Sequence, residues 1–245
     1  MKLSVCMATR NGEKYLAEQL ASIMGQLGQG DELVISDDSS TDGTVAIIER
    51  LQDPRVRLLP GNIFYNPIYN IEHAITRSEG DIIVLSDQDD VWLGNKLAVV
   101  RRWFSSKLPG VHTLVLDGSI MDEHGSVIHD SLFDFLGSGK GIIKNLYRNT
   151  YMGCCMAFSR ELLRVALPFP QRIPMHDSWL GLLSELYGTV EFVPEKTIRY
   201  RRHASNRSFD RFTMGQQIRW RFFLACRLLR TVVSHPVGVI SKRRQ

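Results

Sequence analysis

The sequence lacks several features that would assign it to other classes of protein. No run of 18 uncharged apolar residues occurs, and we therefore expect no transmembrane helix. Residues 3–8 read as a strand, so the N-terminus does not resemble a signal peptide. The four cysteines show neither CxxC nor paired metal-ligand spacing, which favours a reduced, cytoplasmic protein: Cys6, Cys154, Cys155 and Cys226.

Glycine-rich phosphate loops are also missing. The first strand-like segment is not followed by GxGxxG, and GxxxxGK[ST] does not occur in the chain. These absences argue against dinucleotide-dependent redox enzymes and P-loop proteins. They also weaken an assignment as a nucleotidyltransferase, which would be expected to carry such a loop where this chain has Thr9-Arg10-Asn11-Gly12.

The net charge of +4 conceals an uneven distribution along the 245 residues. From Arg199 onward there are twelve Lys or Arg residues and one acidic residue, Asp210, whereas the preceding part holds 18 basic and 25 acidic residues. An acidic body fits poorly with nucleic-acid binding, so we expect no nucleic-acid partner. The basic end could serve phosphate groups or an anionic membrane surface.

Strand and helix patterns alternate through the first hundred residues, and this alternation predicts an α/β fold with a doubly wound, parallel sheet. Ligands bind such sheets beyond the carboxyl ends of the strands. Residues 9–13, 37–42 and 87–90 should therefore lie at one edge. The predicted strands cover 3–8, 32–36, 56–59 and 82–86, and the predicted helices cover 13–27, 43–51, 68–77 and 96–104.

The second half of the chain is less regular. It shows no internal repeat or low-complexity linker, which favours one continuous domain followed by a C-terminal appendage. Strand patterns cover 113–117, 126–128, 154–158 and 190–193, and helix patterns cover 160–166 and 178–187.

Acidic residues follow two of the predicted strands. Asp87, Asp89 and Asp90 place three carboxylates within four residues, which is unfavourable unless a positive charge neutralises them. Either a divalent cation binds there or the segment is an acidic surface turn. The pair Asp37 and Asp38 could accept hydrogen bonds from a nucleobase or ribose, or could belong to a turn and helix cap.

Three segments together resemble glycosyltransferase family 2: Ser4–Glu13, Glu32–Thr44 and Leu85–Trp92. The likeness is strong over residues 2–105 and looser over 113–206. It implies a GT-A fold, a nucleotide-sugar donor and inversion at the anomeric carbon. The GT-A domain would span 1–208, with a nucleotide-binding half at 1–105 and an acceptor half at 106–208, and the basic appendage would span 209–245.

The resemblance also implies roles for individual residues in the donor pocket. Thr9, Asp37 and Asp38 would face the nucleoside, together with Asn70. Asp87-Gln88-Asp89 would form the DxD element, with Asp89 as the main ligand of Mg²⁺ or Mn²⁺ and Asp87 near the metal or ribose. The cation would neutralise a diphosphate that the carboxylates alone would repel.

Two later segments carry further candidates. Arg199–Asn206 resembles the YRxHxxN segment of rhamnosyltransferase-like members, in which His203 would contact the diphosphate or metal and Arg201 or Arg202 would bind phosphate. The alternative is a solvated basic loop. In His176-Asp177-Ser178-Trp179, Asp177 resembles the base that deprotonates the acceptor hydroxyl. It could instead be a helix N-cap, and His176 could be the base or an ordinary loop histidine.

Weaker signals lie between these segments. Tyr151–Cys155 resembles the acceptor-side Gly-Cys segment of the family, although a tight glycine turn under a core strand explains it nearly as well. Asp117 and Asp122 match the family loosely, and we expect a surface turn at both.

Residues 214–233 predict a basic amphipathic helix, with apolar residues within about half of the helical circumference and arginines mainly opposite. Such a helix could lie on an anionic membrane through residues 211–245, pack on its own domain, or bind a second subunit in a homodimer. The apolar residues are Ile218, Phe222, Leu224, Ala225, Leu228, Leu229, Val232 and Val233, and the arginines are Arg219, Arg221, Arg227 and Arg230.

The leading hypothesis is an inverting, metal-dependent glycosyltransferase, in the cytoplasm or at the inner face of the cytoplasmic membrane. It would extend a glycan or lipid-linked acceptor in surface polysaccharide synthesis, with dTDP-rhamnose as the expected donor. A nucleotidyltransferase and a non-catalytic subunit that binds nucleotide-sugar are the alternatives.

Overall fold

A computed structural model describes residues 1–203 and 213–236 of the chain. In this part of the chain the strands are β1 (Leu3–Thr9), β2 (Glu32–Asp37), β3 (Val56–Leu59), β4 (Ile82–Ser86), β5 (Val91–Trp92), β6 (His112–Met121), β7 (Val127–His129), β8 (Met156–Ser159) and β9 (Thr189–Arg201). They form one nine-stranded mixed sheet in the order β3-β2-β1-β4-β8-β6-β9-β5, with β7 beside β6.

The sheet is mostly parallel, as predicted. Strands β3, β2, β1 and β4 are parallel to one another, and β6 and β9 run in the same direction. Strands β5, β7 and β8 run the opposite way. Strands β1 and β2 are buried almost throughout. A strand with both faces covered is apolar along its whole length, which is why both were readable from the sequence.

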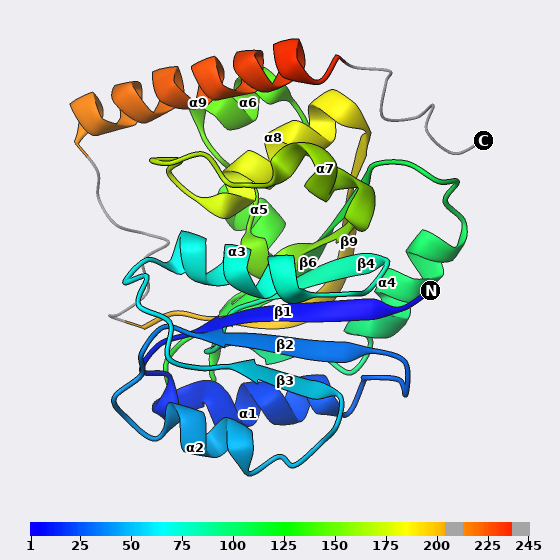
Figure 1. Cartoon of the computed structure of the whole chain (residues 1–245), viewed down its shortest axis with the longest axis vertical. Coiled ribbons are helices and arrows are strands. Elements are labelled where there is room, and N and C mark those ends of the chain that lie inside the picture. Colours follow the sequence, from blue (N-terminus) through cyan, green and yellow to red (C-terminus); the bar gives the residue numbers. More distant parts are fainter. Residues whose placement is uncertain (204–212, 237–245) are drawn as a thin grey trace.

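Helices cover both faces of this sheet. Helices α1 (Glu13–Met24) and α2 (Thr44–Glu49) lie on one face and α3 (Pro67–Arg77) on the other (Figure 1). Helix α4 (Lys96–Ser105) follows the short strand β5. All predicted strands and helices of residues 1–105 are present, with ends shifted by no more than three residues. The predicted doubly wound arrangement is confirmed.

The second half departs from the prediction in length more than in type. β9 runs through Thr189–Arg201, whereas the pattern indicated only residues 190–193. Much of this strand is half-exposed or exposed and carries charged residues, so hydrophobicity did not mark its extent. Two short helices were also missed, α5 (Leu132–Leu136) and α6 (Ile142–Tyr147), whereas α7 (Leu163–Ala166) and α8 (His176–Tyr187) match predicted helices.

The C-terminal helix α9 (Met214–Ser234) matches the predicted amphipathic helix. Its first turn carries a capping box, in which Thr213 and Gln216 each accept a hydrogen bond from the other's backbone N–H. The helix packs against α6 and α8 at the top of the molecule (Figure 1), and Leu224 and Leu228 are its buried residues. The helix therefore rests on its own domain. The proposed boundary between residues 208 and 209 lies outside the described residues.

Among residues 1–203 and 213–236, no helix combines the length and hydrophobicity that crossing a bilayer requires.

Candidate active site

A cavity of about 760 Å³ lies at the carboxyl ends of β1 and β4. The sequence placed residues 9–13, 37–42 and 87–90 at this edge, and residues from all three segments line the cavity. The opposite wall comes from the start of α8 and from the segment before β8. Seven of the predicted site residues line it: Thr9, Asp38, Asn70, Asp87, Asp89, Asp177 and His203. Asp37 and Arg202 do not.

The nucleoside-side residues are held by a local hydrogen-bond network. Asp37, the last residue of β2, accepts hydrogen bonds from Thr9 Oγ1 (3.0 Å) and from the backbone N–H of Ser40 (2.9 Å). Its carboxylate is thereby committed to the turn after β2 rather than to the cavity. Asp38 accepts from the backbone N–H groups of residues 64–66, at 2.6, 3.0 and 3.1 Å. The Asp38 carboxylate therefore shapes the cavity wall by fixing this loop.

Asn70 reaches the same wall from α3. Its side-chain amide donates to the carbonyl of Thr9 at 3.0 Å, and its Oδ1 atom is buried with no hydrogen-bond partner among the described residues. Such atoms on other lining residues include the hydroxyl of Tyr15 and Nδ1 of His176. Buried polar atoms are nearly always paired, so these three atoms are available to a ligand.

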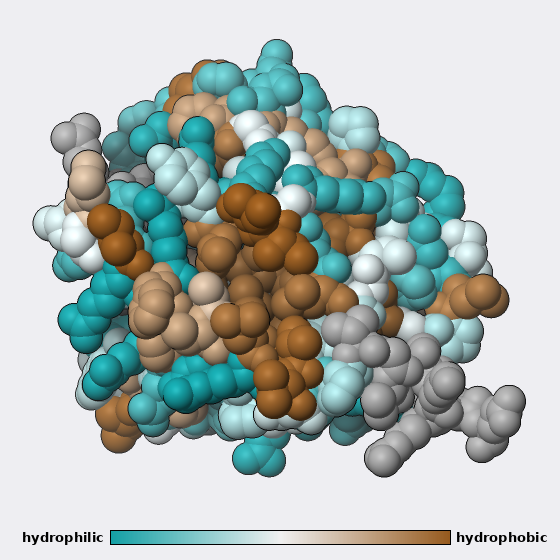
Figure 2. Space-filling view, turned by 90° about the horizontal axis from the view of Figure 1, so that it is seen from above, coloured by the Kyte–Doolittle hydropathy of each residue, from teal (hydrophilic) through white to brown (hydrophobic). Residues whose placement is uncertain are grey.

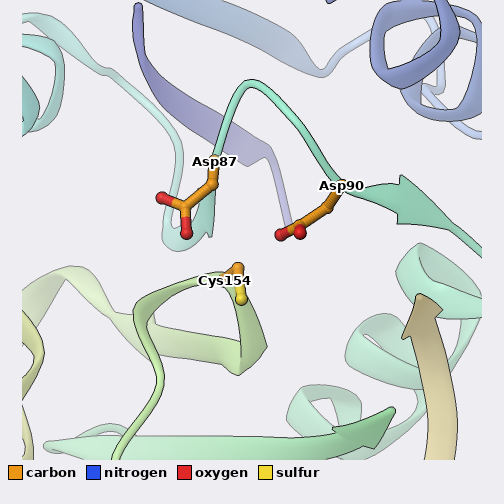
Figure 3. A group of neighbouring side chains, drawn as sticks. All are labelled: Asp87, Asp90 and Cys154. Carbon is orange, nitrogen blue, oxygen red and sulfur yellow. The ribbon is translucent and has the colours of Figure 1, made fainter. Parts of the chain in front are cut away.

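Carboxylates crowd the turn that follows β4. Burial and the carboxylates of Asp89 and Asp177 raise the pKa of Asp87 to about 7. Burial and the charges of Asp89 and Asp87 likewise raise the pKa of Asp90 well above its usual range. Figure 3 shows Asp87 and Asp90 at the two ends of this turn, with Cys154 beside them. Ligand atoms of these three residues lie within 4.8 Å of one another.

Cys154 is a poor ligand for a hard cation in this cluster. Its hydrogen bond with Cys155, together with burial, raises the pKa of its thiol well above the ordinary value, so the sulfur keeps its proton. A protonated thiol can donate to the carboxylates of Asp87 and Asp90, which stabilises their charged forms. Asp90 itself is fully buried, and its Oδ1 accepts from the backbone N–H of Arg201 at 2.9 Å.

Asp89 points toward the end of β9. Its Oδ2 atom lies 2.7 Å from Nε2 of His203, the pair that the sequence suggested as metal ligands. The ring of His203 stacks on Tyr15 with a centroid separation of 5.1 Å. The lining on one side of the cavity thus includes Asp87, Asp89 and His203, whose oxygen and nitrogen atoms are of the kinds that bind Mn²⁺ or Mg²⁺.

Arg201 has a different role from the phosphate contact that the sequence suggested. Its side chain is 3% exposed, donates from Nε to the carbonyl of Asp89 at 2.9 Å, and forms an ion pair with Glu18 at 2.6 Å. It therefore fixes the acidic turn onto β9. Arg202 is exposed, and its guanidinium lies 5.8 Å from the ring of Phe135, away from the cavity.

Lys96 is a site residue that sequence reasoning missed. Its side chain is 1% exposed, donates from Nζ to the carbonyl of Cys154 at 2.5 Å, and lies 4.1 Å from the centre of the Trp92 ring. Burial lowers the pKa of Lys96, whereas the charges of Asp87 and Asp90 favour its protonated form. A buried ammonium next to the acidic turn offsets part of the repulsion between the carboxylates.

Asp177 lies in the first turn of α8, and it is not the N-cap. Met175 occupies the cap position and makes no side-chain cap hydrogen bond. Asp177 Oδ1 accepts from Asn149 Nδ2 at 3.0 Å and from the backbone N–H of Ser178 at 2.5 Å. Burial raises the pKa of Asp177, which favours its protonated form more than in water. A positioned carboxylate with a raised pKa is suited to accept a proton.

His176 lines the same wall, and burial lowers its pKa, so the imidazole is neutral. The glycine of the Gly-Cys segment makes this packing possible: a Cβ atom on Gly153 would lie 2.7 Å from His176 Nε2. The tight glycine turn is confirmed, because Gly153 begins a 3₁₀ turn. Gly153 also lines the cavity, and its acceptor-side role stays a prediction.

One weaker expectation was wrong. Asp117 is 3% exposed and accepts from the hydroxyl of Ser131 and the backbone N–H of Phe133, so it anchors the start of α5 instead of forming a surface turn. Asp122 does lie in a turn, in which it accepts from the backbone N–H groups of His124 and Ser126.

Comparison with known proteins agrees with this geometry. The family model described as glycosyl transferase family 2 matches residues 4–166. The chain belongs to glycosyltransferase family 2. The match contains the acidic turn and the segment at Gly153, and it ends before Asp177 and His203.

Individual family 2 relatives are distant. The chain is 24% identical to the Escherichia coli UDP-Glc:alpha-D-GlcNAc-diphosphoundecaprenol beta-1,3-glucosyltransferase WfgD, over 75% of this chain and 70% of WfgD. It is 37% identical to the Shigella flexneri dTDP-rhamnosyl transferase RfbG, over 37% of this chain and 34% of RfbG. It spans between 38% and 44% of the length of several other curated relatives.

Solved structures show that this family 2 chain has the GT-A fold. Staphylococcus aureus TarS in complex with UDP-GlcNAc matches with a TM-score of 0.74 and 18% identity, over 94% of this chain and 67% of the TarS chain. The mannosyltransferase PcManGT from Pyrobaculum calidifontis, in complex with GDP-Man and Mn²⁺, matches with a TM-score of 0.59 and 18% identity, over 98% of this chain and 77% of that chain.

Proposed function

We propose that this chain transfers a sugar, with inversion, from a nucleotide-sugar donor to a glycan or lipid-linked acceptor in surface polysaccharide synthesis. The observation that carries the proposal is that carboxylates line both walls of one cavity, Asp87 and Asp89 on one wall and Asp177 on the other. Asp87, Asp89 and His203 line one wall and would bind the cation and diphosphate, and Asp177 lines the other wall and would act as the base. Family membership supports the same reaction class.

The nucleoside of the donor would bind along Thr9, Asp38 and Asn70. The unpaired Oδ1 of Asn70 would accept a hydrogen bond from a base or ribose. Because Asp38 already accepts three backbone hydrogen bonds, it would act mainly by holding the loop at residues 64–66 in place. Asp37 would act one step further away, through Thr9.

Asp87, Asp89 and His203 would hold a Mg²⁺ or Mn²⁺ ion. The crowded carboxylates fit this group, because the pKa of Asp87 rises to about 7 when no cation neutralises its neighbours. When bound, the cation would neutralise the diphosphate leaving group. Arg201 and Lys96 would hold the ligand carboxylates in place from behind.

Asp177 would accept the proton of the acceptor hydroxyl as the hydroxyl oxygen attacks the anomeric carbon of the donor. Asn149 and the N–H of Ser178 fix the orientation of its carboxylate. The neutral His176 beside it would orient the acceptor. Attack from this wall, opposite the diphosphate side, is the geometry that inverts the anomeric centre.

Relatives guide the choice of donor and acceptor. The name of RfbG identifies a dTDP-rhamnosyl transferase, which supports dTDP-rhamnose as the first donor to test. The name of WfgD describes a diphosphoundecaprenol-linked acceptor, which supports a lipid-linked glycan as the acceptor. We place the reaction at the cytoplasmic face of the membrane, where such an acceptor would be reached.

A nucleotide panel tests the proposal. UDP, dTDP, GDP and their sugars are added to the purified chain with and without Mn²⁺, and thermal unfolding is followed. We expect one nucleotide to stabilise the protein in a Mn²⁺-dependent manner, and Asp89→Asn to remove that effect. Asp130→Asn, at a carboxylate that is 90% exposed, is the control and should behave as wild type. Stabilisation that needs no metal, or that survives Asp89→Asn, would contradict the metal assignment.

Turnover requires a second measurement. With the stabilising nucleotide-sugar, Mn²⁺ and lipid-linked acceptors, nucleoside diphosphate release should depend on the acceptor. Donor binding without release would favour the non-catalytic alternative.

A further inference from the structure

Part of the apolar arc of helix α9 faces away from the domain. Its inward side is buried at Leu224 and Leu228, which are 3% and 6% exposed. On the outward side, Ile218, Phe222, Leu229 and Val233 are 58%, 72%, 67% and 80% exposed. Because successive helical residues are about 100° apart, these four side chains fall within an arc of about 60°. The apolar arc of the helix therefore extends beyond the part that its own domain covers.

Helix α6 extends the outward apolar side. It packs beside α9, and its Ile143 and Tyr147 are 85% and 70% exposed. Figure 2 looks down on this side of the molecule and shows hydrophobic side chains gathered across it between hydrophilic ones. We call this surface the α6–α9 face, made of Ile143, Tyr147, Ile218, Phe222, Leu229 and Val233. Apolar patches of this kind mark interaction sites on soluble domains.

The charged residues of the two segments that form this face are all basic. Residues 138–150 and 213–236 contain no acidic residue. Arg219 and Arg230 are exposed along one margin of the outward apolar strip, and Arg221 lies on the other margin with its guanidinium 4.4 Å from the centre of the Tyr147 ring. The other basic residues of these segments are Lys140, Lys144, Arg148 and Arg227. Whatever covers the apolar strip must therefore present negative charge along both margins.

A bilayer with anionic headgroups meets these requirements together. An exposed apolar strip along a straight helix about 30 Å long, bordered by arginines, is the arrangement of helices that lie in the headgroup plane. Apolar side chains enter the acyl boundary while arginines pair with lipid phosphates. The described helices include none that could cross the bilayer, so this contact would be peripheral.

We propose that the α6–α9 face docks flat on an anionic phospholipid bilayer. The proposal goes beyond sugar transfer, and it depends on surface residues rather than on the cavity. It differs from the membrane contact inferred from the sequence in two respects. It includes α6, and it assigns contact to one side of α9 while Leu224 and Leu228 stay buried in the domain.

Vesicle sedimentation tests the proposal with the full chain. We expect the protein to sediment with vesicles that contain about one third phosphatidylglycerol at least ten-fold more strongly than with pure phosphatidylcholine vesicles. Phe222→Ser with Leu229→Ser should reduce that binding at least ten-fold. Arg219→Gln with Arg230→Gln should reduce it by a similar factor and weaken its dependence on salt.

A matched control removes apolar side chains elsewhere. Ile63 and Leu108 are 70% and 81% exposed outside the α6–α9 face, and Ile63→Ser with Leu108→Ser should leave vesicle binding unchanged. Equal binding by the Phe222/Leu229 variant and this control would overturn the proposal. A wild-type dimer that becomes monomeric in the Phe222/Leu229 variant, measured by analytical ultracentrifugation without lipid, would also overturn it by assigning the face to a second copy. Neither result would affect the nucleotide panel, so the two proposals can fail separately.

Discussion

Carboxylates have opposite environments at the two edges of the sheet, the amino edge where its parallel strands begin and the carboxyl edge where they end. At the amino edge, Glu32 accepts hydrogen bonds from Ser4 Oγ at 2.6 Å and from Arg57 Nη1 at 2.8 Å. Asp31, next to it, pairs with Arg101 and accepts from the backbone N–H of Leu3. At the carboxyl edge, acids are placed near other acids. The same sheet therefore holds paired acids at one end and crowded acids at the other.

The pKa values follow this contrast. Burial alone would raise the pKa of Glu32, but hydrogen bonds from Ser4, Glu79 and Arg57 lower it below the ordinary value. The pKa of Asp87 rises to about 7 instead, because burial and the charges of Asp89 and Asp177 act in the same direction. Paired acids stabilise the fold, whereas crowded acids destabilise it until a ligand arrives. Such unfavourable crowding in a cavity is typical of functional sites.

The largest expected effect is a loss of sugar transfer when a carboxylate of the carboxyl edge, that of Asp177, is replaced. Asp177→Asn keeps the shape of the side chain and removes the proposed base, so sugar transfer should fall about 10³-fold. Nucleotide-dependent thermal stabilisation should remain, because the residues proposed to bind the cation and diphosphate lie on the other wall. Steady-state nucleoside diphosphate release measures the first effect. A His176→Gln variant that loses more activity than Asp177→Asn would assign the base to His176.

Lys96→Met tests whether the buried ammonium of Lys96 offsets the repulsion between the carboxylates at the carboxyl edge. The change removes the buried ammonium and leaves the carbonyl of Cys154 without its donor, which should lower the free energy of unfolding by about 3 kcal/mol. Mn²⁺ should recover part of this loss by neutralising the same carboxylates. Urea unfolding with and without Mn²⁺ measures both effects. Lys196→Met, at a half-exposed lysine 3.9 Å from Asp130, is the control and should change stability little. Equal stabilities of the two variants would show that Lys96 does not offset the acids.

The sequence predicted the crowded acids at the carboxyl edge but not the buried basic residues that support them. The acidic turn and the first four parallel strands were predictable, because apolar runs such as Leu3–Thr9 and the acids after them are local signals. Lys96 and Arg201 were missed as structural supports because a charged residue is ordinarily exposed, and their burial depends on contacts between distant segments. No local sequence pattern shows that Lys96 and Cys154 lie close together in the fold.

The second half was less predictable for a related reason. β9 lies between β6 and the two-residue strand β5, and its buried, half-exposed and exposed side chains follow no regular alternation and include several charges. Its length is set by pairing with β6 from His112 to Met121, which is a tertiary property. The proximity of His203 to Asp89 depends on where β9 ends, and it could be anticipated only from the family resemblance.

Replacing a glycine by alanine should have different effects at the two edges of the sheet: a loss of stability at the amino edge and a loss of activity at the carboxyl edge. A Cβ atom on Gly80, at the amino edge, would lie 2.6 Å from the backbone nitrogen of Ser4, so Gly80→Ala should destabilise the fold by about 2 kcal/mol. A Cβ atom on Gly153 would instead press on the His176 ring at 2.7 Å. Gly153→Ala should therefore lower activity about ten-fold through displacement of the α8 wall, with a smaller loss of stability.

Thermal unfolding and turnover per folded molecule, measured on both variants, distinguish these effects. Gly94→Ala, where a Cβ atom would meet nothing within 4 Å, is the control. A loss of turnover per folded molecule in Gly80→Ala equal to that in Gly153→Ala would remove the distinction between the edges.

The smallest expected effect lies at the amino edge and depends on pH. Glu32→Gln should lower the free energy of unfolding by about 1–2 kcal/mol at neutral pH, because the neutral amide would interact more weakly with the positive charge of Arg57. The native pKa of Glu32 is lowered, so its contribution is complete above the unfolded-state pKa and is lost as pH falls through the native value. The difference between wild type and Glu32→Gln should thus stay constant from neutral pH to about pH 5.5 and shrink below about pH 4.5. Glu195→Gln, in a more exposed pair with Arg102, should show little difference at any pH. A Glu32→Gln deficit that grows on acidification would mean that Glu32 behaves like the crowded acids at the other edge.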